Sequence, residues 1–366
     1  MGRMPCRVQD RVRERQEGFL VANQCRSVCN DRPLVAASIL VLSLVVDEVD
    51  PAPRAVPVQP GGAGWFTEGF DTGDLKEPRS DRAGKSMITV PRLAAEALGS
   101  FLAASMSRRF GSTNENLVEV IQSAARLALD CIGGSDALYH NVEHTMLVTL
   151  VGYDILKGRS LLKSTPASDY AHFLIACLLH EIGYVRGVLR GDGKQGYIID
   201  ASGGKVKLPR GSSDAALMPY HVDRSKLYVI DRIGGSKLVD AARISRAIEF
   251  TRYPITTGTG GEDDEECLLM RAASLIGQLG DPHYLQKTNA LFYEFEEVGV
   301  NKEFGFTSPA DLTDLYPRLY FDSVSVHLQA AIRYLNITTR GRQWINCLYS
   351  NVFRAEREPS LSGLRL

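Results

Sequence analysis

Apolar residues recur every three to four positions along most of the chain from residue 87 onward, which is the spacing of amphipathic helices. The run "NLVEVIQSAARLALDCIGG" predicts one such helix, with Gly133 as its stop signal. A second predicted helix covers about 137–157. The next run, "SDYAHFLIACLLHEIGY", is apolar on nearly every side from Phe173 to Leu179. This pattern predicts a helix that is buried at the centre of the fold.

The rest of this region is also predicted to be helical, so we expect an all-α fold. Further helices are predicted at about 236–250, 265–279, 282–297, 318–337 and 340–355. A Gly-rich stretch at about 186–228 interrupts them, and its two short β-like runs around Gly203 and Gly204 predict a hairpin with a two-residue turn. We therefore expect a helical bundle over 87–355 with a small β-hairpin insertion.

The first 86 residues have a different pattern. They contain one apolar run, at 34–46, which is shorter than the roughly 20 residues that a membrane-spanning helix needs. Residues 47–86 are rich in Pro, Gly and charge without a period, which is typical of linkers. We expect a poorly ordered extension over 1–86, for which a start-site or gene-fusion artefact is one explanation, no membrane span, and a short tail at 356–366.

Composition narrows the class of protein. The formal net charge is −1 and no basic stripe stands out, which argues against a protein that coats nucleic acid. The chain has an odd number of cysteines, and Cys131, Cys177, Cys267 and Cys347 fall in helix-like stretches where a reduced thiol is the usual state. These features favour a reducing, cytoplasmic location.

The candidate chemistry lies in two short motifs. "YHNVEH" places His140 and His144 four residues apart, and on a helix these side chains would share one face. "LLHEIGY" ends the buried helix with His180 and Glu181. Together they offer imidazole and carboxylate ligands, which bind divalent Mn, Fe, Zn or Ni. Because the chain has only seven histidines, this grouping favours a metal site over separate structural histidines.

At these residues the chain resembles the HD-domain metal-dependent phosphohydrolases, and more narrowly the cyclic-nucleotide phosphodiesterases and their bacterial relatives. The resemblance covers about residues 113–300. It implies one or two divalent ions (Mn, Fe, Mg or Zn), with His144, His180 and Glu181 as ligands and His140 as the proton donor to the leaving oxygen. His221 resembles an extra histidine ligand found in some relatives with a second metal.

Two departures from the family pattern affect this expectation. Glu181 is one methylene longer than the aspartate of the family. The last family ligand, also an aspartate, falls on Ser274, so Asp281 further along is a substitute ligand or, alternatively, the cap of the next helix. Arg224 is a candidate phosphate clamp because a guanidinium matches phosphate oxygens, although a surface or ion-paired arginine fits the sequence as well.

Three functions remain open from the sequence. The first is a metal-dependent phosphohydrolase or phosphodiesterase acting on a small-molecule phosphate ester such as a nucleotide. The second is an HD-type iron oxygenase, because two histidines and one carboxylate are also the ligands of non-haem iron. The third is a degenerate domain that binds metal or a ligand without turnover, for which Ser274 is the main argument.

Overall fold

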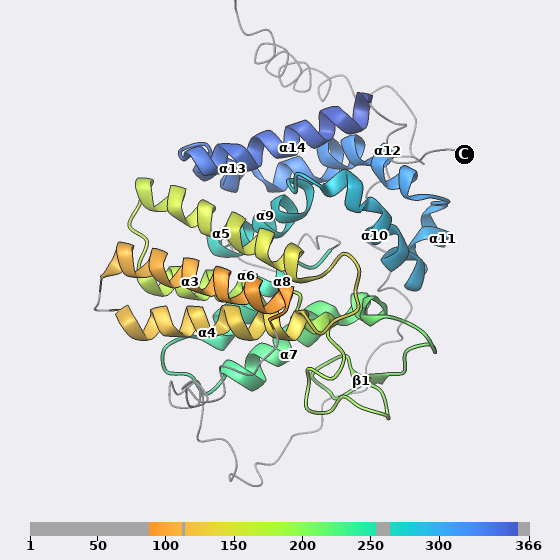
Figure 1. Cartoon of the computed structure of the whole chain (residues 1–366), viewed down its shortest axis with the longest axis horizontal. Coiled ribbons are helices and arrows are strands. Elements are labelled where there is room, and N and C mark those ends of the chain that lie inside the picture. Colours follow the sequence, from red (N-terminus) through yellow and green to blue (C-terminus); the bar gives the residue numbers. More distant parts are fainter. Residues whose placement is uncertain (1–87, 112–113, 254–263, 358–366) are drawn as a thin grey trace, which may run out of the picture.

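The computed structural model describes residues 88–111, 114–253 and 264–357, and the regular elements in these ranges are helices apart from one small β-hairpin (Figure 1). The predicted all-α fold with a hairpin insertion is confirmed. The expected extension over 1–86 lies outside the described residues, as does the tail beyond residue 357. Within the described part of the chain, no helix is both long and apolar enough to cross a bilayer.

The described elements follow one another with short connections. The α-helices are α3 Val90–Phe110, α4 Glu115–Ile132, α5 Val142–Leu162, α6 Ala167–Leu179, α7 His221–Ile233, α8 Ala241–Glu249, α9 Glu265–Leu279, α10 Tyr284–Glu297, α11 Val300–Phe304, α12 Pro309–Leu319, α13 Gln329–Leu335 and α14 Thr339–Arg357. Shorter turns of helix are η3 Ile182–Tyr184, η4 Asp214–Tyr220, the π-helical η5 Tyr320–Val324 and η6 Ser325–His327. The strands are β1 Tyr197–Ile198 and β2 Lys205–Val206.

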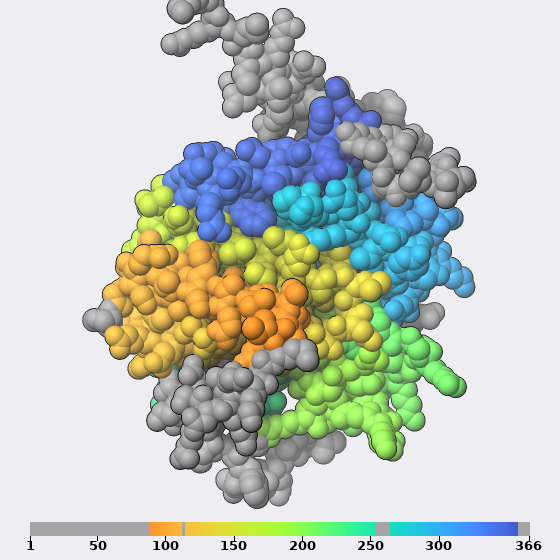
Figure 2. All heavy atoms as spheres, in the orientation of Figure 1, coloured from red at the N-terminus to blue at the C-terminus, as the bar shows by residue number. Residues whose placement is uncertain are grey.

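Helix α6 is the centre of the core, as its sequence predicts. All of its residues except Ser168 and Asp169 are buried, and it packs against α4, α5, α8 and α9. The pair α3 and α4 lies on one side of the bundle, and α13 and α14 lie on the opposite side of α5 (Figure 1). In Figure 2, yellow atoms of the segment that includes α5 lie between the orange atoms of α3 and the blue atoms of the last helices.

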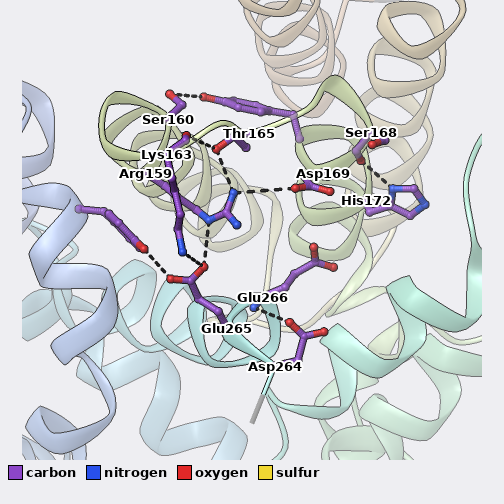
Figure 3. Close-up of polar contacts among 12 residues, drawn as sticks. Arg159, Ser160, Lys163, Thr165, Ser168, Asp169, His172, Asp264, Glu265 and Glu266 are labelled. Atoms are coloured by element: carbon purple, nitrogen blue, oxygen red, sulfur yellow. Dashed lines mark hydrogen bonds and ion pairs between the residues drawn. The ribbon is translucent and has the colours of Figure 1, made fainter. Parts of the chain in front are cut away.

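Helices α5 and α9 are antiparallel neighbours. Glu265 at the start of α9 accepts hydrogen bonds from Arg159 and Lys163 near the end of α5 (Figure 3). Further along, Gly277 packs so closely on Val148 that an added Cβ would lie 2.5 Å from the Val148 Cγ2. The polar contact at one end and the glycine contact at the other fix which residues of the two helices face each other.

The hairpin insertion differs from the predicted two-residue turn. Tyr197 pairs with Val206 and Ile198 with Lys205, so the connection runs over residues 199–204. The Asp200 carboxylate organises this longer loop by accepting hydrogen bonds from the backbone N–H groups of Ser202 and Gly204. An aspartate side chain that binds the backbone two residues later replaces the tight turn expected at the two glycines.

Two predicted helices are shorter than expected. The segment predicted as one helix at 318–337 is divided into the end of α12, a π-helical turn, a 3₁₀ turn and α13. Pro317 near the end of α12 cannot donate a backbone hydrogen bond, which weakens the helix where the irregular turns begin. The helix predicted at 236–250 begins only at Ala241, because the Asp240 side chain caps it through the N–H groups of Ala242 and Arg243.

We expect the hydrogen bonds and ion pairs of Glu265 to stabilise the fold in a way that depends on pH. Partial burial alone would raise the pKa of Glu265, but hydrogen bonds from Lys163, Tyr334 and Arg159 lower that pKa to about 2. A carboxyl whose pKa is lower in the folded state stabilises the fold above its ordinary pKa, and this stabilisation is lost as the pH falls toward the lowered value.

We therefore expect Glu265→Gln to reduce the free energy of unfolding at pH 7 by about 1 kcal/mol, because solvent screens these half-exposed pairs. The wild-type and variant curves should converge as the pH falls from about 5 to 2. Urea unfolding followed by circular dichroism at several pH values measures both curves. Parallel curves over this range would contradict the assigned pKa.

Candidate metal centre

The first motif lies at the start of α5 and does not form the helical pair that its spacing predicts. The Asn141 side chain caps α5 by accepting hydrogen bonds from the N–H groups of Glu143 (3.0 Å) and His144 (3.3 Å). Asparagine is a strongly preferred N-cap residue, so the helix begins after Asn141 and His140 lies before the helix. The cap nevertheless brings the His140 and His144 rings together, with centroids 5.3 Å apart.

The second motif directly follows the end of α6. The His180 Nδ1 lies 2.8 Å from the carbonyl oxygen of Cys177. Because a carbonyl oxygen can only accept, this nitrogen carries the proton and the His180 Nε2 lone pair is free to bind a cation. That Nε2 lies 3.2 Å from the Glu181 Oε1, which in turn lies 3.6 Å from the His144 Nε2.

His221 reaches the same centre from the first residue of α7. Its Nδ1 donates to the carbonyl oxygen of Met218 at 2.6 Å, so its Nε2 is also left as a free acceptor, 3.7 Å from the Glu181 Oε2. Gly183 permits this approach, because an added Cβ would lie 2.0 Å from the His221 carbonyl oxygen. The Tyr184 ring stacks between the rings of His140 and His221, with centroids 4.6 Å away on each side.

The Glu181 carboxylate is the centre of the cluster. One oxygen faces His144 and His180, and the other faces His221. His144 and Glu181 are each only 5% exposed and His180 is fully buried. Despite this burial, the His180 Nε2 and the Glu181 Oε2 have no hydrogen-bond partner. Unpaired buried polar atoms are costly, and a bound cation would satisfy both at once.

The charge states suit metal binding. Burial lowers the pKa of His144 to about 4 and also lowers the pKa of His221, so both imidazoles favour the neutral form that binds metals. Burial alone would raise the pKa of Glu181, but the neighbouring His180 and His221 hold it well below its usual value. The cluster therefore combines an ionised carboxylate with the imidazoles of His144 and His221, which favour the neutral form.

Glu294 belongs to the site and was missed from the sequence. This buried residue of α10 accepts hydrogen bonds from the N–H groups of Tyr139 (2.7 Å) and His140 (3.1 Å), and its other oxygen lies 2.5 Å from the His140 Nδ1. Burial alone would lower the pKa of His140, but Glu294 raises it above its usual value. The sequence feature that could have identified Glu294 is its position on the buried side of α10, beside Leu291 and Phe295.

The structure does not bring Arg224 into the cluster, so the expected phosphate clamp is corrected. The guanidinium is fully buried, pairs with Asp192 at 2.9 Å, and donates to the carbonyl oxygens of Gly183, Val185 and Ile198. These partners use its donors within the protein. Arg224 therefore ties α7 to the hairpin insertion as an ion-paired arginine, one of the two alternatives that the sequence left open.

The last ligand position also differs from the expectation. The Asp281 carboxylate accepts a hydrogen bond from the N–H of His283 at 2.8 Å and pairs with Lys287 at 2.6 Å. It therefore holds the turn before α10, whose N-cap is His283, and is neither a ligand of the cluster nor the helix cap. Ser274 lies on α9 one turn before Gly277, which packs on Val148. Because α9 runs antiparallel to α5, Ser274 is further from His144 than Gly277 is. Neither residue completes the cluster.

Comparison with known proteins identifies a family without describing an activity. The profile of the Npun_R2479-like family matches residues 89–358, so the chain belongs to this family. No curated protein and no solved structure matches the chain. The matched residues include the whole cluster around Glu181 and also Glu294.

The position of Arg224 predicts a large effect on stability. Arg224→Leu would leave the Asp192 carboxylate buried without its cation, and we expect the free energy of unfolding to fall by about 3–5 kcal/mol. Arg190→Leu is the matched control, because its ion pair with Asp231 in the same region is largely exposed and should contribute less than about 1 kcal/mol.

Chemical denaturation measures all of these variants. The double variant Arg224→Leu, Asp192→Asn should recover part of the loss, because it removes the buried charge as well. Equal stability of Arg224→Leu and the Arg190 control would contradict a structural role for Arg224.

Proposed function

We propose that this member of the Npun_R2479-like family is a metal-dependent phosphoric ester hydrolase that acts on a small-molecule phosphate ester such as a nucleotide. The observation that carries the proposal is the buried Glu181 carboxylate, surrounded by His144, His180 and His221 and left with an unpaired oxygen. His140 and its partner Glu294 stand beside this centre. A metal site next to an imidazole of raised pKa is the minimum that such hydrolysis needs.

The donor set fits a divalent ion. Ligand atoms of His140, His144 and Glu181 lie within 4.8 Å of one another. The His180 Nε2 lies 3.2 Å from the Glu181 Oε1, so we assign one ion to His144, His180 and Glu181, and His221 on the other side of the carboxylate would add a further nitrogen. Backbone carbonyls fix the ring orientations of His180 and His221 in the manner typical of metal-binding histidines. A bound ion would supply a Lewis acid that polarises a phosphoryl oxygen and acidifies a water molecule.

His140 is assigned the role of proton donor rather than ligand. Its Nδ1 is engaged by Glu294, which leaves its Nε2 to donate a proton to the leaving alkoxide oxygen. The pKa of His140 is raised, whereas the pKa of the neighbouring His144 is lowered. The histidine with the raised pKa is suited to donate a proton, and the histidine with the lowered pKa is suited to bind a metal. Tyr184 stacks on the His140 ring and holds it in this orientation.

A second candidate is an iron oxygenase. The nitrogen-rich set favours it, because His144, His180 and His221 surround one carboxylate, and two histidines with one carboxylate bind non-haem iron in many oxygenases. The two candidates share the metal ligands and differ in their chemistry. Oxygen consumption that depends on iron supports the oxygenase, whereas phosphate release supports the hydrolase.

Replacing His180 tests the ligand assignment. We expect His180→Ala to lower the metal content of the purified protein at least tenfold while leaving the helical circular dichroism signal largely intact, because His180 contributes a ligand from the end of a helix. Elemental analysis measures the bound metal. His283→Ala is the control, since His283 is 64% exposed and should keep the wild-type metal content. Unchanged metal in His180→Ala would refute the site.

Replacing His140 tests the division of roles. We expect His140→Ala to retain its metal and to lose about 10²–10⁴-fold in hydrolysis, the usual contribution of a general acid. Glu294→Gln should retain metal and lose less. The assay is release of phosphate or alcohol from a panel of phosphate monoesters and diesters with Mn, Mg, Fe and Zn.

Three outcomes separate the possible functions. Loss of metal in His140→Ala would instead make His140 a ligand. Metal binding without hydrolysis, but with oxygen consumption, would move the assignment to the oxygenase. Metal binding without either activity would make this a degenerate, non-catalytic domain.

A further inference from the structure

A second candidate site lies in an open cleft between the C-terminal part of α3 and the second half of α5, which we call the α3–α5 cleft. Its volume is about 570 Å³, within the usual size of small-molecule sites. The residues that line it are Ser105, Arg108, Arg109, Phe110, Tyr153, Lys157 and Tyr170. No carboxylate is among these lining residues, and three of them are cations.

The three cations of the cleft are not held in ion pairs. Neither Arg108 nor Arg109 nor Lys157 forms an ion pair with a carboxylate of the described residues. The nearby Asp154 is buried, contacts Trp344 and Arg340 through its Oδ2, and attracts Lys157 without forming an ion pair with it. Arg159 on α5, by contrast, pairs with Glu265. Three unpaired cations around one cleft raise the local concentration of anions.

Two of these cations are already held in position. The Arg109 guanidinium lies 5.5 Å from the centre of the Phe110 ring and 5.4 Å from that of Tyr170, where the ring faces attract it. Arg108 donates to the hydroxyl of the buried Ser105 at 3.3 Å. A binding group that is fixed before the ligand arrives loses less side-chain entropy on binding.

We propose that the α3–α5 cleft binds a polyphosphate anion. The guanidinium forks of Arg108 and Arg109 match phosphate oxygens, and Lys157 adds a third cation across the cleft. Two sources share this chemistry: a nucleoside polyphosphate, whose base could contact the rings of Phe110, Tyr153 and Tyr170, and inorganic polyphosphate, which would use the cations alone.

The α3–α5 cleft is separate from the candidate metal centre. Lys157 and His144 both lie on α5, and their positions along the helix differ by roughly 20 Å at 1.5 Å per residue. The ligand of the cleft is therefore a second bound molecule and not the substrate at Glu181. The proposal does not depend on the function proposed for the metal centre.

Calorimetric titration of the full chain with inorganic tripolyphosphate, ATP and adenosine, in a buffer with a chelator, tests the proposal. The cleft variant Arg108→Gln, Arg109→Gln, Lys157→Gln should bind tripolyphosphate at least tenfold more weakly than the wild type. The matched variant Lys194→Gln, Lys207→Gln, Lys302→Gln removes the same charge from exposed positions outside the cleft and should stay within about twofold. Lys157→Gln alone is a milder replacement at an exposed position in case the triple variant folds poorly.

The remaining outcomes are equally distinct. His180→Ala should bind tripolyphosphate as the wild type does. Loss of binding in that variant would indicate that the anion binds at the metal centre, and this would overturn the proposal. Equal weakening in the two triple variants, or no binding by the wild type, would also overturn it. Tighter binding of ATP than of tripolyphosphate would identify a nucleotide, and equal binding would identify an inorganic anion.

Discussion

The site depends on one buried carboxylate. Transfer of an ionised carboxylate out of water costs several kcal/mol unless a positive partner is present. Among the described residues, Glu181 pairs with no lysine or arginine, and the groups around it are the imidazoles of His144, His180 and His221. Burial lowers the pKa of His144 and His221 and so weakens the positive charge that these imidazoles can offer, although attraction to His180 and His221 still lowers the pKa of Glu181. The divalent cation proposed above would supply the positive partner that the carboxylate needs.

The fold brings these groups together at the ends of elements rather than along their faces. Asn141 caps α5 and turns His140 back toward His144, while His180 ends α6 and His221 begins α7. Gly183 allows the start of α7 to touch the turn after α6, and Glu294 reaches His140 from α10. Helix ends leave backbone carbonyls and N–H groups free, so they can orient the imidazoles that a metal would bind.

The sequence predicted the parts of this arrangement that depend on local pattern. The apolar run of α6 and the limits of α9 were confirmed, and the two histidine motifs do meet. Contacts between distant segments could not be predicted, because nothing in the sequence links Glu294 to His140, 154 residues earlier. For the same reason Arg224 and Asp281 were assigned to the site, although their tertiary partners are Asp192 and Lys287.

The extra methylene of Glu181 does not argue against the site. On a regular helix, a side chain one methylene longer than aspartate would carry its carboxylate past the other ligands. Glu181 instead follows the end of α6 with φ −103° and ψ 2°, in the sparsely populated bridge region where active-site residues often lie. From this backbone position its two oxygens lie 3.2–3.7 Å from nitrogens of His144, His180 and His221. The backbone therefore accommodates the longer side chain, and the carboxylate remains central to the cluster.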